Sequence, residues 1–270
     1  MHVQLKRGGA LDQSVFKIEH MRTKTIRVLV ALAVTSVITQ AAVRVHKEVA
    51  SGTTQGYSVI THVADGGGWT TTIVLNNLGT TPAEFGITFH GDSGINQVFP
   101  FVGGGEASIV TGTIPVGGQW TLQTADISPT TTTGWAFVES PSGGDIAGFA
   151  VFGYATGYEA VVPIDSPSPS VLLPFDNTDD HAMGIAVANP FLDSPANCNV
   201  VFLDGSGQKI LSDSFSMTPA QHASFVLTDN WPALAGLAGT MLISSDSPIT
   251  ILGIRANSRG GYTTFFSLVP

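Results

Sequence analysis

An internal repeat constrains this chain more than any other feature. Residues 74–94 (VLNNLGTTPAEFGITFHGDSG) align without gaps with residues 187–207 (VANPFLDSPANCNVVFLDGSG), at an offset of 113. The identical pairs are Val74/Val187, Asn76/Asn189, Pro82/Pro195, Ala83/Ala196, Phe89/Phe202, Ser93/Ser206 and Gly94/Gly207. Residues 134–140 and 239–245 form a second, weaker match. Self-similarity at one fixed spacing predicts two copies of one structural unit.

The repeated segment has the period of a β-strand. Apolar residues alternate with small or polar ones in residues 85–89, and residues 198–202 do the same. A period of two with one apolar face predicts a half-buried strand, and Gly- and Asp-rich turn sequences follow both segments. Further short strands are expected at 57–63, 70–77, 95–101, 106–114, 119–124, 134–140 and 146–154. We therefore expect an all-β chain with two tandem immunoglobulin-like β-sandwich domains.

The expected domain boundaries follow from composition. They are a signal peptide region at 1–42, a lead-in linker at 43–56, a first sandwich at 57–163, a Pro/Ser-rich linker at 164–170 and a second sandwich at 171–270.

Residues 21–42 have the pattern of a secretory signal. A basic start, MRTKTIR, precedes an apolar run over 28–38 and a small-residue end, and Met21 is the expected initiator. The apolar run is too short to span a bilayer, which needs ~20 residues. We expect cleavage after Ala41 or Ala42, no membrane insertion afterwards, and a secreted or cell-surface protein, with the periplasm as the alternative.

Charge excludes two classes of partner. The residues after position 56 include three Lys or Arg and 17 Asp or Glu, a net charge of −14, and residues 57–163 contain no Lys or Arg. Such a body cannot neutralise phosphates, so we expect no nucleic-acid partner and no docking on anionic lipid. The remaining partners are an extracellular protein or a glycan.

The single cysteine, Cys198, cannot form an internal disulfide or a cysteine-based metal site. In the repeat alignment it takes the place of Phe85, on the apolar side of the predicted strand. Cys198 is therefore expected to be a small buried hydrophobic residue.

The densest polar cluster is DNTDDH at 176–181. Oxygen ligands from Asp176, Asp179 and Asp180 could hold Ca²⁺, but the spacing differs from the known calcium-loop pattern. The first copy has only Asp65 at the corresponding place. The alternative, which we favour, is an Asx turn leading into a strand. The cluster also invites an acid–base role for His181, although neighbouring residues on a strand point apart. We predict no metal and no cofactor, and keep these three aspartates as the metal candidates.

Two further sets of residues, the histidines and the tryptophans, are candidates for a functional role. His62, His90 and His222 lack the spacing of zinc ligands and are expected to be surface or turn residues. The four tryptophans could stack on sugars, although large aromatic residues more often pack in cores. They are Trp69, Trp120, Trp135 and Trp231. Trp69 lies beside a glycine run and stays the candidate for ligand binding.

Two strings carry a resemblance to a known family. HVADGGGWTTTIVLN from His62, together with LPFDNT from Leu173, resembles a tandem β-sandwich repeat of secreted and cell-surface proteins from environmental bacteria. The resemblance covers most of residues 57–270. It implies export and β architecture, and it carries no activity because the family is functionally uncharacterised.

The sequence favours a non-enzymatic function. We expect an exported structural or adhesive β-sandwich module, because no residue pattern has the context of a catalytic site. The first alternative is a carbohydrate-binding module that uses exposed aromatic residues. The second is a hydrolase whose site the sequence does not reveal.

Overall fold

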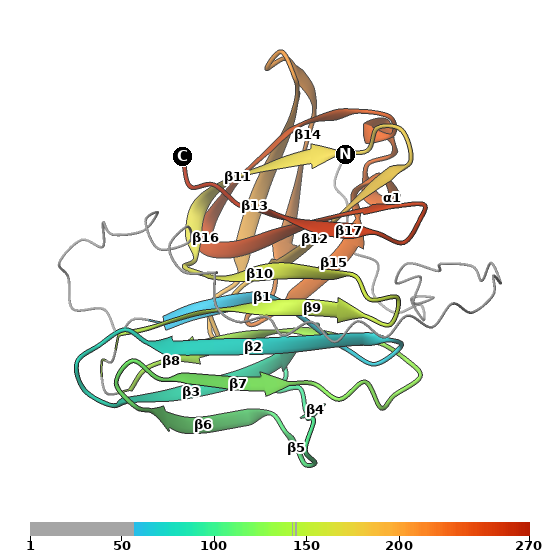
Figure 1. Cartoon of the computed structure of the whole chain (residues 1–270). Coiled ribbons are helices and arrows are strands. Elements are labelled where there is room, and N and C mark those ends of the chain that lie inside the picture. Colours follow the sequence, from blue (N-terminus) through green and yellow to red (C-terminus); the bar gives the residue numbers. More distant parts are fainter. Residues whose placement is uncertain (1–56, 142, 144) are drawn as a thin grey trace, which may run out of the picture. The chain divides into compact units, whose positions relative to one another are not determined.

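The computed structural model describes residues 57–141, 143 and 145–270 (Figure 1). The predicted signal region at 1–42 and lead-in at 43–56 lie outside the described residues. The described chain is all-β, with one short helix, α1 (Leu227–Asn230), and one 3-10 turn, η1 (Pro232–Leu234). No helix in this part of the chain is long and apolar enough to cross a membrane. All of these residues belong to one compact unit.

The first half of the described chain, residues 57–165, forms a sheet that closes around a core. Its strands are β1 (Tyr57–Asp65), β2 (Trp69–Asn77), β3 (Ala83–Gly91), β4 (Phe99–Pro100), β5 (Glu106–Ala107), β6 (Ile109–Ile114), β7 (Gln119–Gln123), β8 (Thr132–Glu139), β9 (Ile146–Tyr154) and β10 (Glu159–Asp165). The order in the sheet is β6-β3-β8-β1-β10-β9-β2-β7, and β4 pairs with β5 separately. β1 pairs with β8 along one edge and with β10 at Val59 and Ile60 along the other, and its pairing with β8 is irregular between Ile60 and Val63.

The strand expected at 95–101 is shortened to β4. The backbone of 91–97 turns back on β3 instead, with Gly91 N donating to Ile95 O and Gln97 N donating to Phe89 O.

The second half, residues 168–270, is organised around one long strand. Its strands are β11 (Ser168–Asp176), β12 (His181–Ala188), β13 (Ala196–Asp204), β14 (Lys209–Met217), β15 (His222–Val226), β16 (Ala238–Asn257) and β17 (Tyr262–Phe266). The first part of β16 pairs with β11 and β13, and its last part pairs with β12 and β17. This strand therefore contributes to two layers at once.

The strand pairing of the first half recurs in the second. The order β6-β3-β8-β1 corresponds to β14-β13-β16-β11, and β7-β2-β9-β10 corresponds to β15-β12-β16-β17. Phe89 on β3 and Phe202 on β13 are both fully buried, as the repeat predicts. Cys198 is buried as well, and this burial raises the pKa of its thiol.

The gapless alignment is wrong before residue 83. Asn77, and not Asn76, corresponds to Asn189, because each of these two side-chain amides donates to two carbonyls of the adjoining loops. The acceptors are Thr81 and Ile114 for Asn77, and Ser194 and Thr218 for Asn189. The loop that follows is one residue longer in the second half, so the offset is 112 before it and 113 after it. On a strand, a shift of one residue exchanges the two faces.

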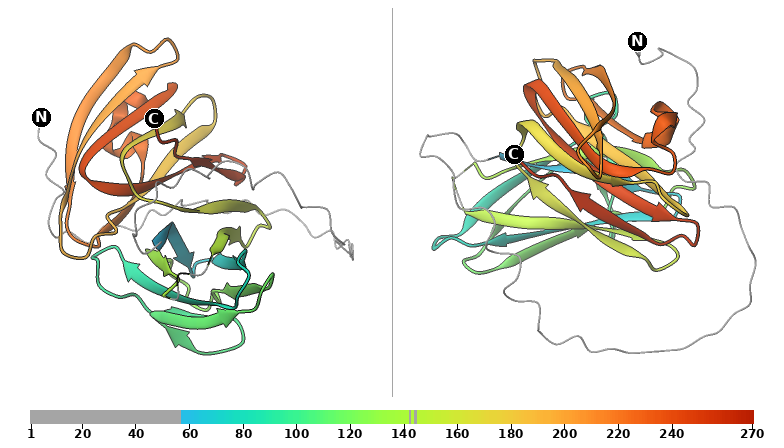
Figure 2. Two further views of the ribbon diagram at one scale, coloured as in Figure 1. Left: turned by 90° about the vertical axis from the view of Figure 1, so that its left-hand side faces the viewer. Right: turned by 90° about the horizontal axis from the view of Figure 1, so that it is seen from above.

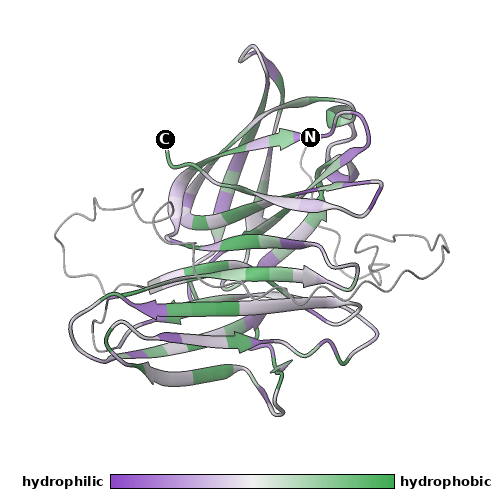
Figure 3. Ribbon diagram, in the orientation of Figure 1, coloured by the Kyte–Doolittle hydropathy of each residue, from purple (hydrophilic) through white to green (hydrophobic). Residues whose placement is uncertain are grey.

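Each half has its own apolar core, and the two cores meet. Figure 3 shows apolar stretches along the strands of both halves. Ala186 of β12 and Leu252 of β16 belong to the core cluster of the first half. A smaller cluster between the halves contains Val59, Trp135 and Ala188. These residues pack because β12 and β16 lie against β1, and β17 lies beside β10 (Figure 2). We call this contact surface the joint.

The connection between the halves is shorter than the expected linker at 164–170. β10 ends at Asp165 and β11 begins at Ser168, so only Ser166 and Pro167 lie outside strands.

Candidate functional site

Three titratable side chains form a hydrogen-bonded chain in the joint. Nδ1 of His222 donates to Oδ1 of Asp92 at 2.7 Å. Nε2 of the same ring lies 3.1 Å from Nδ1 of His62, and the two imidazoles stack with their centroids 5.1 Å apart. Thr133 Oγ1 donates to the carboxylate of Asp92. The chain therefore links β1, the loop after β3 and β15.

Burial and hydrogen bonding determine which of these side chains are charged. His62 and His222 are buried, whereas the side chain of Asp92 is 58 % exposed. Burial, with a smaller contribution from His222, lowers the pKa of His62 to about 3. Partial burial raises the pKa of Asp92, but its hydrogen bonds to His222 and Thr133 bring it below the ordinary value. At neutral pH, His62 is uncharged and Asp92 is ionised.

Nδ1 of His62 and Nε2 of His222 face each other, so a proton on one of these nitrogens has the other as its acceptor. A hydrogen bond joins the rings when exactly one of the two facing nitrogens is protonated. With both protonated, two N–H groups face each other in a buried contact without an acceptor, which is unfavourable. Solvent reaches the carboxylate of Asp92, whereas the two imidazole rings behind it are enclosed. These three hydrogen-bonded side chains are therefore suited to holding the two halves together at the joint.

The expectation that His62, His90 and His222 lie on the surface or in turns is wrong. All three rings are buried, and His90 stacks on Trp135 with centroids 4.6 Å apart. Trp135 in turn donates from Nε1 to Ala220 O across the joint. The sequence separates His62 from His222 by 160 residues, so spacing could not reveal their contact.

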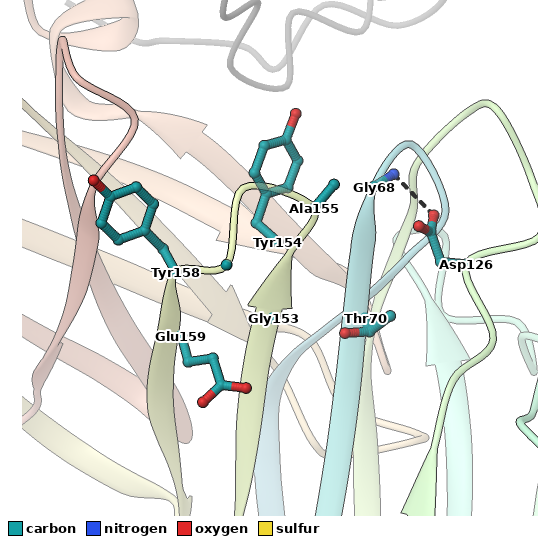
Figure 4. Close-up of a pocket in the computed structure, with 9 residues that line it drawn as sticks. Gly68, Thr70, Asp126, Gly153, Tyr154, Ala155, Tyr158 and Glu159 are labelled. Atoms are coloured by element: carbon teal, nitrogen blue, oxygen red, sulfur yellow. Dashed lines mark hydrogen bonds between the residues drawn. The ribbon is translucent and has the colours of Figure 1, made fainter. Parts of the chain in front are cut away.

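A small open pocket lies at the turn between β9 and β10. Its volume is about 210 Å³. Figure 4 shows Tyr154 and Tyr158 rising from this hairpin, Glu159 below Tyr158, and Asp126 on the opposite side beside Gly68. Asp126 Oδ1 accepts a hydrogen bond from Gly68 N at 2.8 Å. The lining residues are Gly68, Thr70, Asp126, Gly153, Tyr154, Ala155, Gly157, Tyr158 and Glu159.

Trp69 does not line this pocket. It begins β2 and is partly buried, with its ring packed on Tyr154 and Tyr262 at centroid distances of 4.6 and 5.1 Å. The tryptophans do not form one platform either, because Trp120 packs on Phe85 and Trp231 packs on Phe202.

The acidic loop at 176–181 forms local hydrogen bonds. Asp176 Oδ1 accepts from Thr178 N at 3.0 Å, which is the Asx turn that the sequence favours, and its Oδ2 accepts from Arg255 at 2.6 Å. The Thr178 hydroxyl, with help from Arg255, lowers the pKa of Asp176 to about 2. Asp180 accepts from Ser258 Oγ. Asp179 has a left-handed backbone, with φ of 53°. Within the described residues, no group of three or more potential ligands could hold a metal ion.

Comparison with protein-family models, curated proteins and solved structures found no match to this chain.

Proposed function

We propose that this chain is an exported, non-enzymatic structural or adhesive module built from two immunoglobulin-like sandwich repeats. The observation that carries the proposal is the joint, in which Ala186 and Leu252 of the second half complete the core of the first. A joint of this kind holds two units in one fixed relation, which suits a rigid spacer or a surface element. Modules linked by a flexible tether would lack such a shared core.

The placement of the titratable groups supports the same proposal. The His62 and His222 rings are buried in the joint, so a substrate could not approach them. A general acid or base must lie within hydrogen-bond reach of a bound substrate, directly or through one water.

Two measurements test this proposal. N-terminal sequencing of material recovered from the medium or cell surface should find a start near Ala42 or Val43. A panel of chromogenic ester, glycoside and peptide substrates should show no turnover. Turnover that is lost in the Asp179→Ala variant would overturn the proposal in favour of a hydrolase.

The pocket favours a second candidate function, the binding of a neutral saccharide. Its two tyrosines offer apolar ring surface, and the carboxylates of Asp126 and Glu159 can accept hydrogen bonds from sugar hydroxyls. The absence of Lys and Arg from residues 57–163 argues against an anionic ligand.

A glycan array tests this second candidate. Tyr158 is 44 % exposed, so Tyr158→Ala should remove binding without disturbing a core. Phe266→Ala is the matched control, because Phe266 is an aromatic residue of similar exposure outside the pocket. Equal binding by both variants would exclude this pocket as the saccharide site.

A further inference from the structure

The two surfaces that meet in the joint each have an equivalent elsewhere in the chain. The second half contributes the outer face of its β12–β16 layer, where Ala186 pairs with Leu252. The first half contributes its β1–β10 edge, where Val59 pairs with Asp165 and packs in the joint. Because the strand pairing recurs, both surfaces have a counterpart in the other half.

The counterpart of the outer face of the β12–β16 layer lies on β2 and β9. Val74 pairs with Phe149 there, as Ala186 pairs with Leu252 in the second half. Leu252 is 1 % exposed because it packs in the joint, whereas Phe149 is 37 % exposed. Val161 of the neighbouring strand β10 is 45 % exposed and pairs with Val151 on the same face. We call this surface, formed by Phe149, Val151 and Val161 around the buried Val74, the free face.

The counterpart of the β1–β10 edge lies at the C-terminal end of the described chain. Leu172 of β11 forms an isolated bridge with Leu268, as Val59 of β1 pairs with Asp165. Val59 is fully buried in the joint, whereas Leu268 is 56 % exposed and Val269 is 62 % exposed. We call this surface, formed by Leu172, Leu268 and Val269, the free edge.

We propose that the free face of one chain docks on the free edge of a second copy, repeating between chains the contact that joins the two halves. Such a contact uses two different surfaces, so each chain added leaves one free face and one free edge. A heterologous contact that does not close into a ring produces an open, head-to-tail chain of molecules. The proposal deepens the structural function proposed above and gives its partner as a second copy of this protein.

The strength of the contact should depend on salt in a defined direction. The two surfaces are apolar, while the body of the protein carries a net charge of −14 after residue 56. Repulsion between like-charged molecules is screened by salt, whereas apolar contact is not weakened by screening. Added sodium chloride should therefore strengthen the association of these apolar surfaces. It would weaken a contact made by ion pairs.

Sedimentation velocity of the full chain over about 1 µM to about 1 mM tests the proposal. The weight-average sedimentation coefficient should rise with concentration without levelling at a dimer. Phe149→Asp, on the free face, and Leu268→Asp, on the free edge, should each be monomeric alone. An equimolar mixture should form a dimer that grows no further, because each variant retains one intact surface.

Ile127→Asp is the matched control, since Ile127 is 75 % exposed in the loop after β7 and should not affect association. A wild-type protein that stays monomeric throughout would overturn the proposal. So would dimers that form from either Asp variant alone, because these would indicate a symmetric contact. The substrate panel described above is independent of this result, so an enzymatic activity and a lack of self-association would be recognised separately.

Discussion

Replacing His62 by phenylalanine should make the stability of the protein less sensitive to acid. Phenylalanine retains a flat ring that can stack on His222 and contact Phe152, but it has no nitrogen to titrate. The wild-type protein keeps His62 uncharged in a buried site. Acid favours unfolding because the unfolded chain accepts a proton that the folded site excludes.

The magnitude follows from the pKa values. The pKa of His62 is about 3 in the folded state, against an ordinary value of 6.5. A group whose folded pKa is lowered contributes stability that is fully present above the unfolded pKa and is lost as the pH falls toward the folded pKa. Each pH unit in this window lowers the free energy of unfolding by ~1.4 kcal/mol. A fall from about pH 7.5 to about pH 4.5 should therefore lower the free energy of unfolding of the wild-type protein by ~2.7 kcal/mol through His62 alone.

Urea unfolding at these two pH values measures the effect. The His62→Phe variant should lose ~2–3 kcal/mol less than wild type over the same interval. Val59→Ala is the control, because Val59 is buried in the same joint and has no titratable group. It should lower stability at both pH values and leave the difference between them unchanged. The reasoning would be refuted if His62→Phe lost as much stability in acid as wild type does.

Four other outcomes are expected. Thr250→Val should raise the free energy of unfolding by ~1–2 kcal/mol in urea titrations, because the Thr250 hydroxyl is buried without a hydrogen-bond partner in the described structure; a lower stability would mean that it has one. Gly239→Ala should cost ~1–3 kcal/mol, since a Cβ there would clash with the carbonyl oxygen of Leu203, while Gly205→Ala, with open space around it, should change stability by less than ~0.5 kcal/mol. Phe89→Ala should cost ~3–5 kcal/mol by the same measurement, and a smaller loss would contradict its place in the core. Melting curves in chelator and in ~10 mM calcium should overlay, and a rise in calcium that Asp179→Ala abolishes would mean that the acidic loop binds the metal.

Local patterns in the sequence predict the strands and the core. Alternation identifies the strands of Phe89 and Phe202, and the repeat places Cys198 in the interior, as the structure shows. The same repeat gives a wrong register around Asn76, because the loop after Asn189 is one residue longer than the loop after Asn77. A short gapless alignment cannot detect such an insertion. The expected strand at 95–101 does not extend over 95–98, because turns and not alternation organise the backbone there, and the expected strand at 106–114 is interrupted at Ser108.

The joint could not be predicted by the same means. Its contacts join residues that are far apart in sequence, such as His62 and His222, and depend on how one half packs against the other. One signal was nevertheless present. Residues 183–188 (MGIAVA) are apolar without alternation, and all six are buried. An antiparallel strand that is apolar on both sides is covered on both faces, so this segment indicated a second packing partner.

The shared core between the halves limits how a chain of this kind can change by duplication and loss. Neither half can be deleted alone without loss of packing: deletion of the first would expose Leu252, and deletion of the second would leave the core of the first incomplete. Substitutions at Ala186 would also be selected jointly with those on β1, although the two lie in different copies. The two halves are therefore expected to be retained or lost together.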